Sequence, residues 1–142
     1  MKLADVNVLL YAANADSPSH ARAYAWLDQS LAAPAGVAFS WMALLGFVRL
    51  ATRPGIFPRP LPVATAFDFV RAWLSHPHAR IVNPGRRHAA LLEQLLRATG
   101  AGGNLTSDAH LAALAIEHGA TLTSFDRDFA RFEGLDFEQL RP

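Results

Sequence analysis

The sequence predicts an α/β fold: three layers, in which a short, mostly parallel central sheet is flanked by helices. Two observations lead to this prediction. Short apolar segments of strand length alternate along the chain with longer segments whose apolar residues recur at helical spacing. No repeat, low-complexity tract or long linker interrupts this alternation, so residues 1–142 are expected to form a single domain. A chain of this length buries roughly two thirds of its unfolded surface, which is enough for a core.

The expected strands are short, and helices alternate with them along the chain. They are predicted over residues 3–6, 35–39, 80–82, 120–124 and 135–137. Because connections of this kind bring the chain back to the same side of the sheet, successive strands are expected to run parallel. Their carboxyl ends then lie along one edge of the sheet, where ligands bind in open α/β sheets.

The expected helices begin and end at residues that favour helix ends. The first, of about two turns, is expected to begin at Asn7 as its N-cap, and the second opens at Ser17 and Pro18. Further helices are predicted from 40 to about 52, from 63 to 75, from 88 to about 99, and from 104 or 106 to 118. The proline-rich stretch 54–62 is predicted to be a mobile loop, and the glycine-rich stretch 100–103 a helix stop and turn.

Composition narrows the class of function. The formal net charge is only +1, so no strong positive field marks the chain as a nucleic-acid binder. The absence of cysteine excludes disulfides and thiolate metal sites. We find no apolar stretch of about 18 residues and no secretory leader, so a cytoplasmic location without membrane contact is expected. The hydrophobic fraction of 51% is high for a small monomer and predicts a subunit interface or a bound partner.

Acidic residues stand where the expected elements meet one edge of the sheet. Asp5 follows the first strand, Asp126 and Asp128 follow the strand that ends at residue 124, and Asp108 lies in the first turn of a helix, facing inward. Taken singly, each has a structural interpretation as a cap, a helix N-terminal acid or a turn residue. Clustered carboxylates repel one another and persist mainly where a divalent cation offsets their charge. Together they predict a site for Mg²⁺ or Mn²⁺, serving phosphoryl transfer or phosphodiester hydrolysis.

The sequence allows two roles for each of two polar residues near these acids. Asn7 and Ser124 each cap a helix or close a turn, or else hydrogen-bond an acid that binds the ion.

Three segments of the chain resemble the acidic blocks of PIN domains, and more narrowly those of the VapC-type toxins of bacterial toxin–antitoxin pairs. They are DVNVLLYA over residues 5–12, GNLTSDAHLAALA over 103–115 and GATLTSFDRDF over 119–129, and the resemblance covers essentially the whole chain. It implies a PIN-like fold and a Mg²⁺- or Mn²⁺-dependent endoribonuclease that cleaves RNA and so inhibits translation. It also implies a homodimer that a small cognate antitoxin neutralises, with DNA contacted only through the antitoxin.

The resemblance also implies roles for individual residues. By position, Asp5 and Asp108 match metal ligands, and Asp126 matches the third core acid, which is also a metal ligand. Asp128 matches an accessory acid, and Ser124 a small hydroxyl residue often found in the last block.

One position departs from the family pattern. Many members carry a glutamate three positions before an arginine in the helix after the second strand; here the arginine is Arg49 and the earlier position is Gly46. Glycine has no side chain to bind a metal, so we expect a three-acid core in which Asp128 supplies the missing charge. The gap leaves open a catalytically impaired PIN-fold module that only binds a partner. Arg49, a charge in an apolar helix, is expected to support the site by pairing with an acid, unless it contacts phosphate or extends to the surface.

Other features bear on rivals and partners. A HAD-like phosphatase or a receiver domain needs a lysine in mid-chain, and Lys2 is the only lysine. The helix over 40–52 has more apolar residues than one buried face needs and is the predicted dimer or antitoxin interface; these residues are Trp41, Leu44, Leu45, Phe47 and Val48. Four arginines are candidates for an RNA track, with solvated surface positions as the alternative: Arg53, Arg59, Arg86 and Arg87.

Overall fold

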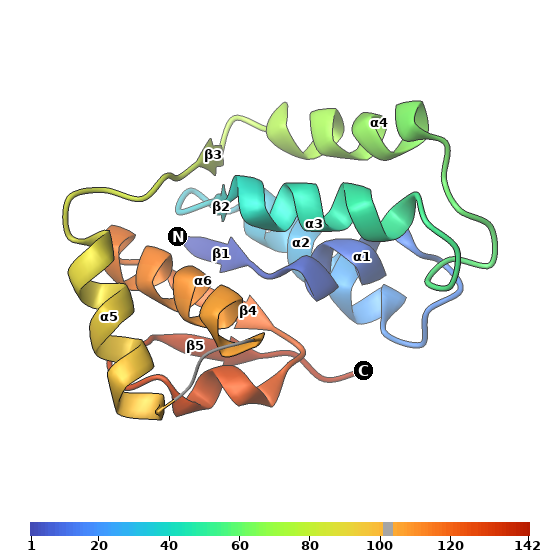
Figure 1. Ribbon diagram of the computed structural model, residues 1–142. Helices are drawn as coiled ribbons and strands as arrows, with labels where there is room; N and C mark the ends of the chain where they lie inside the picture. Colours follow the sequence, from blue (N-terminus) through green and yellow to red (C-terminus); the bar gives the residue numbers. More distant parts are fainter. Residues whose placement is uncertain (101–103) are drawn as a thin grey trace.

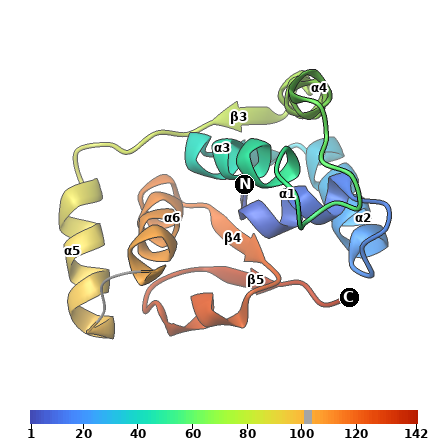
Figure 2. The same cartoon turned by 45° about the vertical axis from the view of Figure 1, so that its right-hand side comes forward.

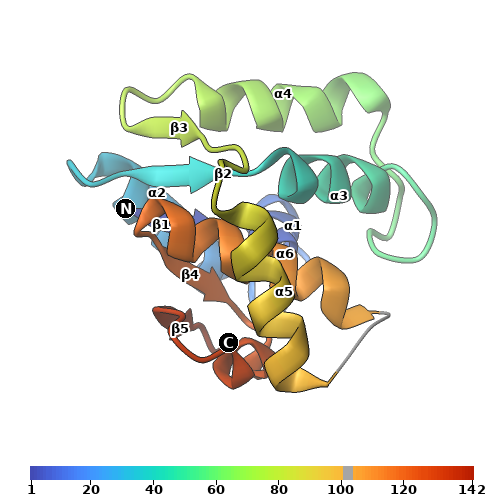
Figure 3. The ribbon, with the colours of Figure 1, turned by 60° about the vertical axis from the view of Figure 1, so that its left-hand side comes forward.

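A single sheet of parallel strands forms the centre of the computed structural model, which describes residues 1–100 and 104–142 (Figure 1). The strands are β1 (Lys2–Ala4), β2 (Val37–Phe39), β3 (Ala79–Ile81), β4 (Thr121–Ser124) and β5 (Phe137–Gln139). Their order is β3-β2-β1-β4-β5, which is visible from the side in Figure 3, and every pairing is parallel. The predicted three-layer α/β architecture is therefore confirmed.

Helices cover both faces of the sheet, as predicted. They are α1 (Val6–Ala13), α2 (His20–Ala32), α3 (Trp41–Ala51), α4 (Val63–Leu74), α5 (His88–Thr99) and α6 (Asn104–His118). In Figure 2, α5 and α6 lie on one side of the strands and α1 to α4 on the other. Side chains of neighbouring strand residues enter two different cores: Ala4 and Phe39 pack with α1 to α4, whereas Leu3 and Leu122 pack with α5 and α6. Among the described helices, none has both the length and the apolar character needed to cross a membrane.

The structure corrects several expected boundaries. The first strand ends at Ala4 rather than at residue 6, because Val6 begins α1, and the second begins at Val37 rather than at residue 35. Asp5, not Asn7, caps α1, because the Asp5 carboxylate accepts a hydrogen bond from the Val6 amide and the helix has already begun at Asn7. The second helix begins at His20, because Ser17 closes a turn by accepting hydrogen bonds from the next residues. The last strand lies two residues later than predicted, since its pairing with β4 starts at Phe137.

Two glycine- or proline-rich stretches also bear on the predictions. The stretch 54–62 holds no helix or named strand, as predicted for a loop, and buried Phe57 anchors it to the core. Gly100 ends α5 in the left-handed conformation at φ 67°, which favours glycine, whereas residues 101–103 of the predicted turn lie outside the described residues.

Polar contacts hold α5 against α6, the helix that carries Asp108. The His88 and His110 side chains share a hydrogen bond of 2.9 Å between Nε2 and Nδ1. The Glu117 carboxylate accepts hydrogen bonds from the Gly85 and Arg87 amides just before α5, at 2.7 and 3.1 Å. These donors lower the pKa of Glu117. These contacts thus hold the start of α5 against the α6 helix.

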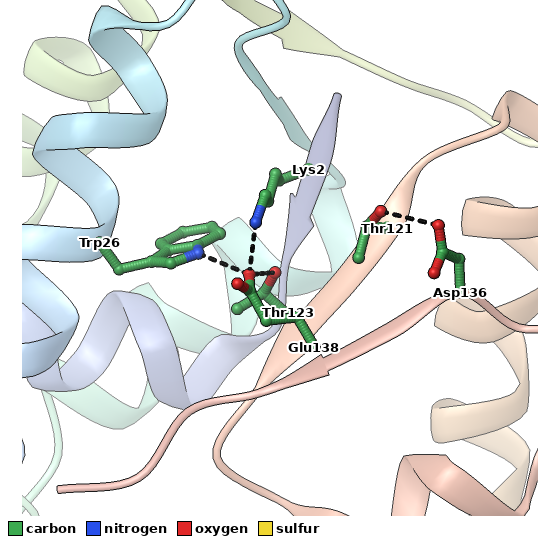
Figure 4. Close-up of polar contacts among 6 residues, drawn as sticks. All are labelled: Lys2, Trp26, Thr121, Thr123, Asp136 and Glu138. Atoms are coloured by element: carbon green, nitrogen blue, oxygen red, sulfur yellow. Dashed lines mark hydrogen bonds and ion pairs between the residues drawn. The ribbon is translucent and has the colours of Figure 1, made fainter.

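Glu138 ties the edge strand β5 to the centre of the sheet (Figure 4). Its Oε1 accepts hydrogen bonds from Lys2 Nζ at 2.7 Å, Trp26 Nε1 at 2.9 Å and Thr123 Oγ1 at 3.0 Å. Burial raises the pKa of Glu138, but these donors outweigh it and lower the pKa below the usual 4.5. The only lysine of the chain therefore has a structural partner.

Glu138→Gln is expected to lower the free energy of unfolding at pH 7, because the hydrogen bonds to the Glu138 carboxylate lose their charge. The loss should be only about 1 kcal/mol, since solvent reaches the carboxylate and screens its charge. A lowered carboxyl pKa stabilises the fold above 4.5, and this stabilisation is lost as the pH falls through the folded-state pKa. Urea titrations should therefore show the difference at pH 7 and little of it in strong acid. Exposed Glu133→Gln is the control, and an equal loss at both pH values would contradict a charge origin.

Candidate functional site

The parallel pairing of β1 with β4 brings two polar residues together at the carboxyl edge of the sheet. Ala4 pairs with Thr123, so Asp5 and Ser124, the next residues of each strand, are neighbours. The Asp5 amide donates to the Thr123 carbonyl at 3.0 Å, which continues the ladder for one more residue. The edge predicted from the strand ends is thus formed by these two strands.

The Asp5 carboxylate is held at both oxygens. Oδ1 accepts a hydrogen bond from the Val6 amide and Oδ2 one from Ser124 Oγ, each at 2.7 Å. Burial raises the pKa of Asp5; the two hydrogen bonds oppose this effect, and the charge of Asp126 adds to it. An acid that is partly desolvated and repelled by a neighbouring acid is one that a cation would stabilise.

Ser124 and Asn7 form a small hydrogen-bond network around Asp5. Ser124 Oγ donates to Asp5 and accepts from Asn7 Nδ2 at 3.1 Å and from the Asp126 amide at 2.9 Å. Asn7 Oδ1 accepts from the Phe125 amide at 3.2 Å. Of the two interpretations left open by the sequence, Ser124 therefore has the bond to the acid, whereas Asn7 reaches Asp5 only through Ser124.

Asp126 and Asp128 lie at the start of a short 3₁₀ helix, η1 (Arg127–Arg131), which the sequence did not predict. Asp126 is its N-cap, and Asp126 Oδ1 accepts a hydrogen bond from the Asp128 amide at 2.9 Å. Exposed Asp128 pairs with Arg131, with 3.4 Å between Oδ2 and Nη2. The signal for this turn was the Asp126 cap followed by Phe129 and Phe132, two apolar residues three positions apart that are both buried.

Asp108 is half-buried on α6 and lies within electrostatic reach of the other acids. Burial, followed by the charges of Asp5, Asp126 and Asp128, raises the pKa of Asp108 to about 6, and the charge of Arg131 opposes this rise. The four predicted acids thus act on one another from three separate segments of the chain.

The donor set fits a hard divalent cation in its chemistry. Carboxylate oxygens are the protein ligands that Mg²⁺ and Mn²⁺ prefer, and Mg²⁺ needs only one or two of them beside water and substrate oxygens. Across residues 1–100 and 104–142, no three His, Asp or Glu side chains already stand as a complete metal-binding group. The chain therefore offers the charge and the ligand type, without a preformed cage.

Gly46 and Arg49 do not contribute to this acid cluster. A Cβ on Gly46 would lie 2.8 Å from Val6 Cγ2, so α3 and α1 pack too closely there for a larger residue. The expected ion pair of Arg49 with an acid was wrong: its side chain is exposed, and it pairs with no carboxylate in the described parts of the chain. The reason is helical spacing, since Arg49 follows exposed Trp41 and Leu45 at intervals of four residues.

Comparisons with known proteins agree on one family. The model of the PIN domain family matches residues 2–135. Ribonuclease VapC37 of Mycobacterium tuberculosis is 52% identical over 139 residues, which cover 98% of this chain and 96% of that protein.

Solved structures with a similar fold include two toxin–antitoxin proteins. VapBC2 from Rickettsia felis, bound to a DNA fragment from their promoter, superposes with a TM-score of 0.71 at 19% identity over 97% of each chain. Mycobacterium tuberculosis VapC20, a sarcin–ricin loop cleaving toxin, gives a TM-score of 0.67 at 20% identity, covering 96% of this chain and 99% of that one. At such low identities these likenesses bear on the fold alone.

Proposed function

The chain belongs to the PIN domain family, in its VapC-type group, and we propose that it is a Mg²⁺- or Mn²⁺-dependent endoribonuclease, the toxin of a toxin–antitoxin pair, which cleaves RNA and thereby inhibits translation. One observation carries the proposal. Acids from three separate segments stand at the carboxyl edge of a parallel sheet, where burial, and after it the charge of at least one neighbouring acid, raises the pKa of Asp5 and of Asp108. The name of the 52% identical relative supports the activity.

In this proposal Asp5, Asp108 and Asp126 hold the cation, and Asp128 is the accessory acid. When bound, the cation would supply an acidified water and offset the charge that develops at the phosphorus. Ser124 orients Asp5 by donating to Oδ2, and Asn7 steadies Ser124 through its amide group. The Asp128 amide holds Oδ1 of Asp126 in the same way. The chain's own contribution thus includes two acids, Asp5 and Asp126, whose directions are fixed by hydrogen bonds.

The alternatives are less well supported. A HAD-like phosphatase needs a lysine at the phosphate, but the ammonium group of Lys2 is bound to the Glu138 carboxylate. A catalytically impaired module rests on Gly46 alone, and the tight packing against Val6 gives that glycine a structural reason.

Two apolar surfaces are available for the proposed homodimer and antitoxin contacts. On α3, the predicted interface helix, Trp41, Met42 and Leu45 are exposed. A groove of about 240 Å³ lies between α1, α2 and α4, and its lining includes Tyr24 and Trp73. Exposed apolar patches of this kind mark protein interaction sites. We propose that one receives the second copy of the chain and the other the antitoxin, and that DNA is contacted only by the antitoxin.

Metal removal tests the proposed activity. The purified chain, free of antitoxin, is expected to cut RNA into discrete fragments with Mg²⁺ or Mn²⁺, and chelation with EDTA should lower the rate by about 100-fold or more. Adding Mn²⁺ back to the chelated sample should restore the same fragments, which controls for damage by EDTA. Cleavage that persists in EDTA would overturn the metal dependence, and no cleavage with either ion would overturn the activity.

A further inference from the structure

Arg131 is a cation anchored inside the acid-rich edge. Its Nε donates a hydrogen bond to the Asp128 carbonyl at 2.9 Å, which fixes the guanidinium beside the η1 backbone. Its Nη2 lies 3.4 Å from Asp128 Oδ2, a long contact to a carboxylate that is 53% exposed. Nη1 has no hydrogen-bond partner among the described residues. The side chain is 38% exposed, so it is accessible from solvent.

The charge of Arg131 reaches Asp108 as well. Of the charged groups that act on the pKa of Asp108, the acids Asp5, Asp126 and Asp128 raise it, and Arg131 is the one that lowers it. The geometry places the guanidinium at Asp128, through the Nε bond to the backbone and the Nη2 contact with the carboxylate. When a divalent cation neutralises the charge of the acids, the attraction between the Arg131 guanidinium and the Asp128 carboxylate weakens. The guanidinium donors are then available to an anion of the substrate.

We propose that Arg131 binds a phosphate of the RNA backbone next to the cleaved bond. This inference rests on the proposed ribonuclease function and adds a substrate-binding residue to it. A guanidinium suits the role because its planar donors match two phosphate oxygens at once, whereas an ammonium group offers a single point of charge. Contacts to phosphate position a nucleic acid without reading its bases. Arg131 would therefore fix the position of the RNA backbone relative to the acids.

Arg131→Gln is expected to raise the KM for RNA about tenfold at saturating Mg²⁺, with a smaller effect on kcat. The salt dependence should also weaken: the slope of log KM against log salt should fall by about 0.7, the value for one phosphate contact to a single strand. Arg127→Gln is the matched control, because Arg127 lies on the same 3₁₀ helix, is exposed and is paired with no described carboxylate. Its KM should stay within about twofold of the unmodified chain.

Arg131→Lys separates charge from geometry. It keeps the charge but loses the planar fork and its Nε donor, so its KM should fall between those of the unmodified chain and Arg131→Gln. Equal KM values and salt slopes for Arg131→Gln and Arg127→Gln would overturn the inference. So would a change confined to the affinity for Mg²⁺, since Arg131 would then only balance the acids. If the unmodified chain cuts no RNA with either ion, the proposed function fails instead.

Discussion

Asp108→Asn is expected to lower the rate of RNA cleavage by about 10³-fold or more, while making the metal-free protein more stable. The activity falls because a neutral amide replaces a charged ligand of the proposed cation. The stability rises because the same charge is unfavourable in the absence of the ion. Burial and the charges of three other acids raise the pKa of Asp108 to about 6, so the carboxylate costs folding energy at neutral pH.

The pH dependence of this cost follows from its sign. The pKa is 3.8 when the chain is unfolded and about 6 when it is folded, so the folded state holds the proton more tightly. The associated stability is fully present below 3.8 and is lost as the pH rises through about 6. Asp108 is half-exposed, and solvent screens part of the repulsion, so we expect a gain of about 1 kcal/mol for Asp108→Asn at pH 7.

Urea denaturation without divalent ions, at pH 7 and below pH 3.8, measures the change in stability of Asp108→Asn. The rate of RNA cleavage with Mg²⁺ measures its change in activity. Asp28→Asn makes the same change of charge on the exposed surface of α2 and should alter neither quantity appreciably. A variant that cuts RNA at the normal rate would remove Asp108 from the site. A metal-free variant that is less stable at pH 7 would show that the acids do not repel one another.

The location of the acids could be predicted from the sequence because it depends on topology. Asp5 follows an apolar run of strand length, and Asp126 follows another, so parallel pairing alone brings them to one edge. Helical spacing likewise turned Asp108 toward the protein interior. Their roles as metal ligands stay predictions, since they concern an ion rather than the fold.

Other features depend on contacts that a sequence pattern does not contain. Asp5 takes the cap position because its carboxylate reaches the Val6 amide, and Asn7 is left to bond Ser124. The η1 helix forms because Asp126 caps it and buried Phe129 packs beneath it, whereas polar residues in a row predicted only a turn. For this reason the position of Arg131 beside the acids could not be foreseen.

The role of Gly46 also depends on a packing contact that the sequence does not show; the sequence indicated only that an acid is missing at this position. Gly46→Glu is expected to lower the free energy of unfolding by about 3 kcal/mol rather than to restore a ligand. The new Cβ would lie 2.8 Å from Val6 Cγ2, and the β-branched Val6 side chain has little freedom to rotate away. Val6 also donates its amide to the Asp5 carboxylate, so moving α1 aside would disturb Asp5 itself. RNA cleavage should therefore fall along with stability.

Two further variants isolate the contact between Gly46 and Val6. Gly46→Ala adds only the Cβ, and its gain in helix propensity of about 1 kcal/mol should largely offset the clash, giving a small net change. Adding Val6→Ala to Gly46→Glu opens the space, so the double variant should be more stable than the sum of the single effects by about 1–2 kcal/mol. Strict additivity, or a Gly46→Glu protein as stable as the unmodified chain, would mean that packing does not exclude an acid there. The glycine would then need a catalytic explanation, and the impaired-module alternative would gain the support it lacks.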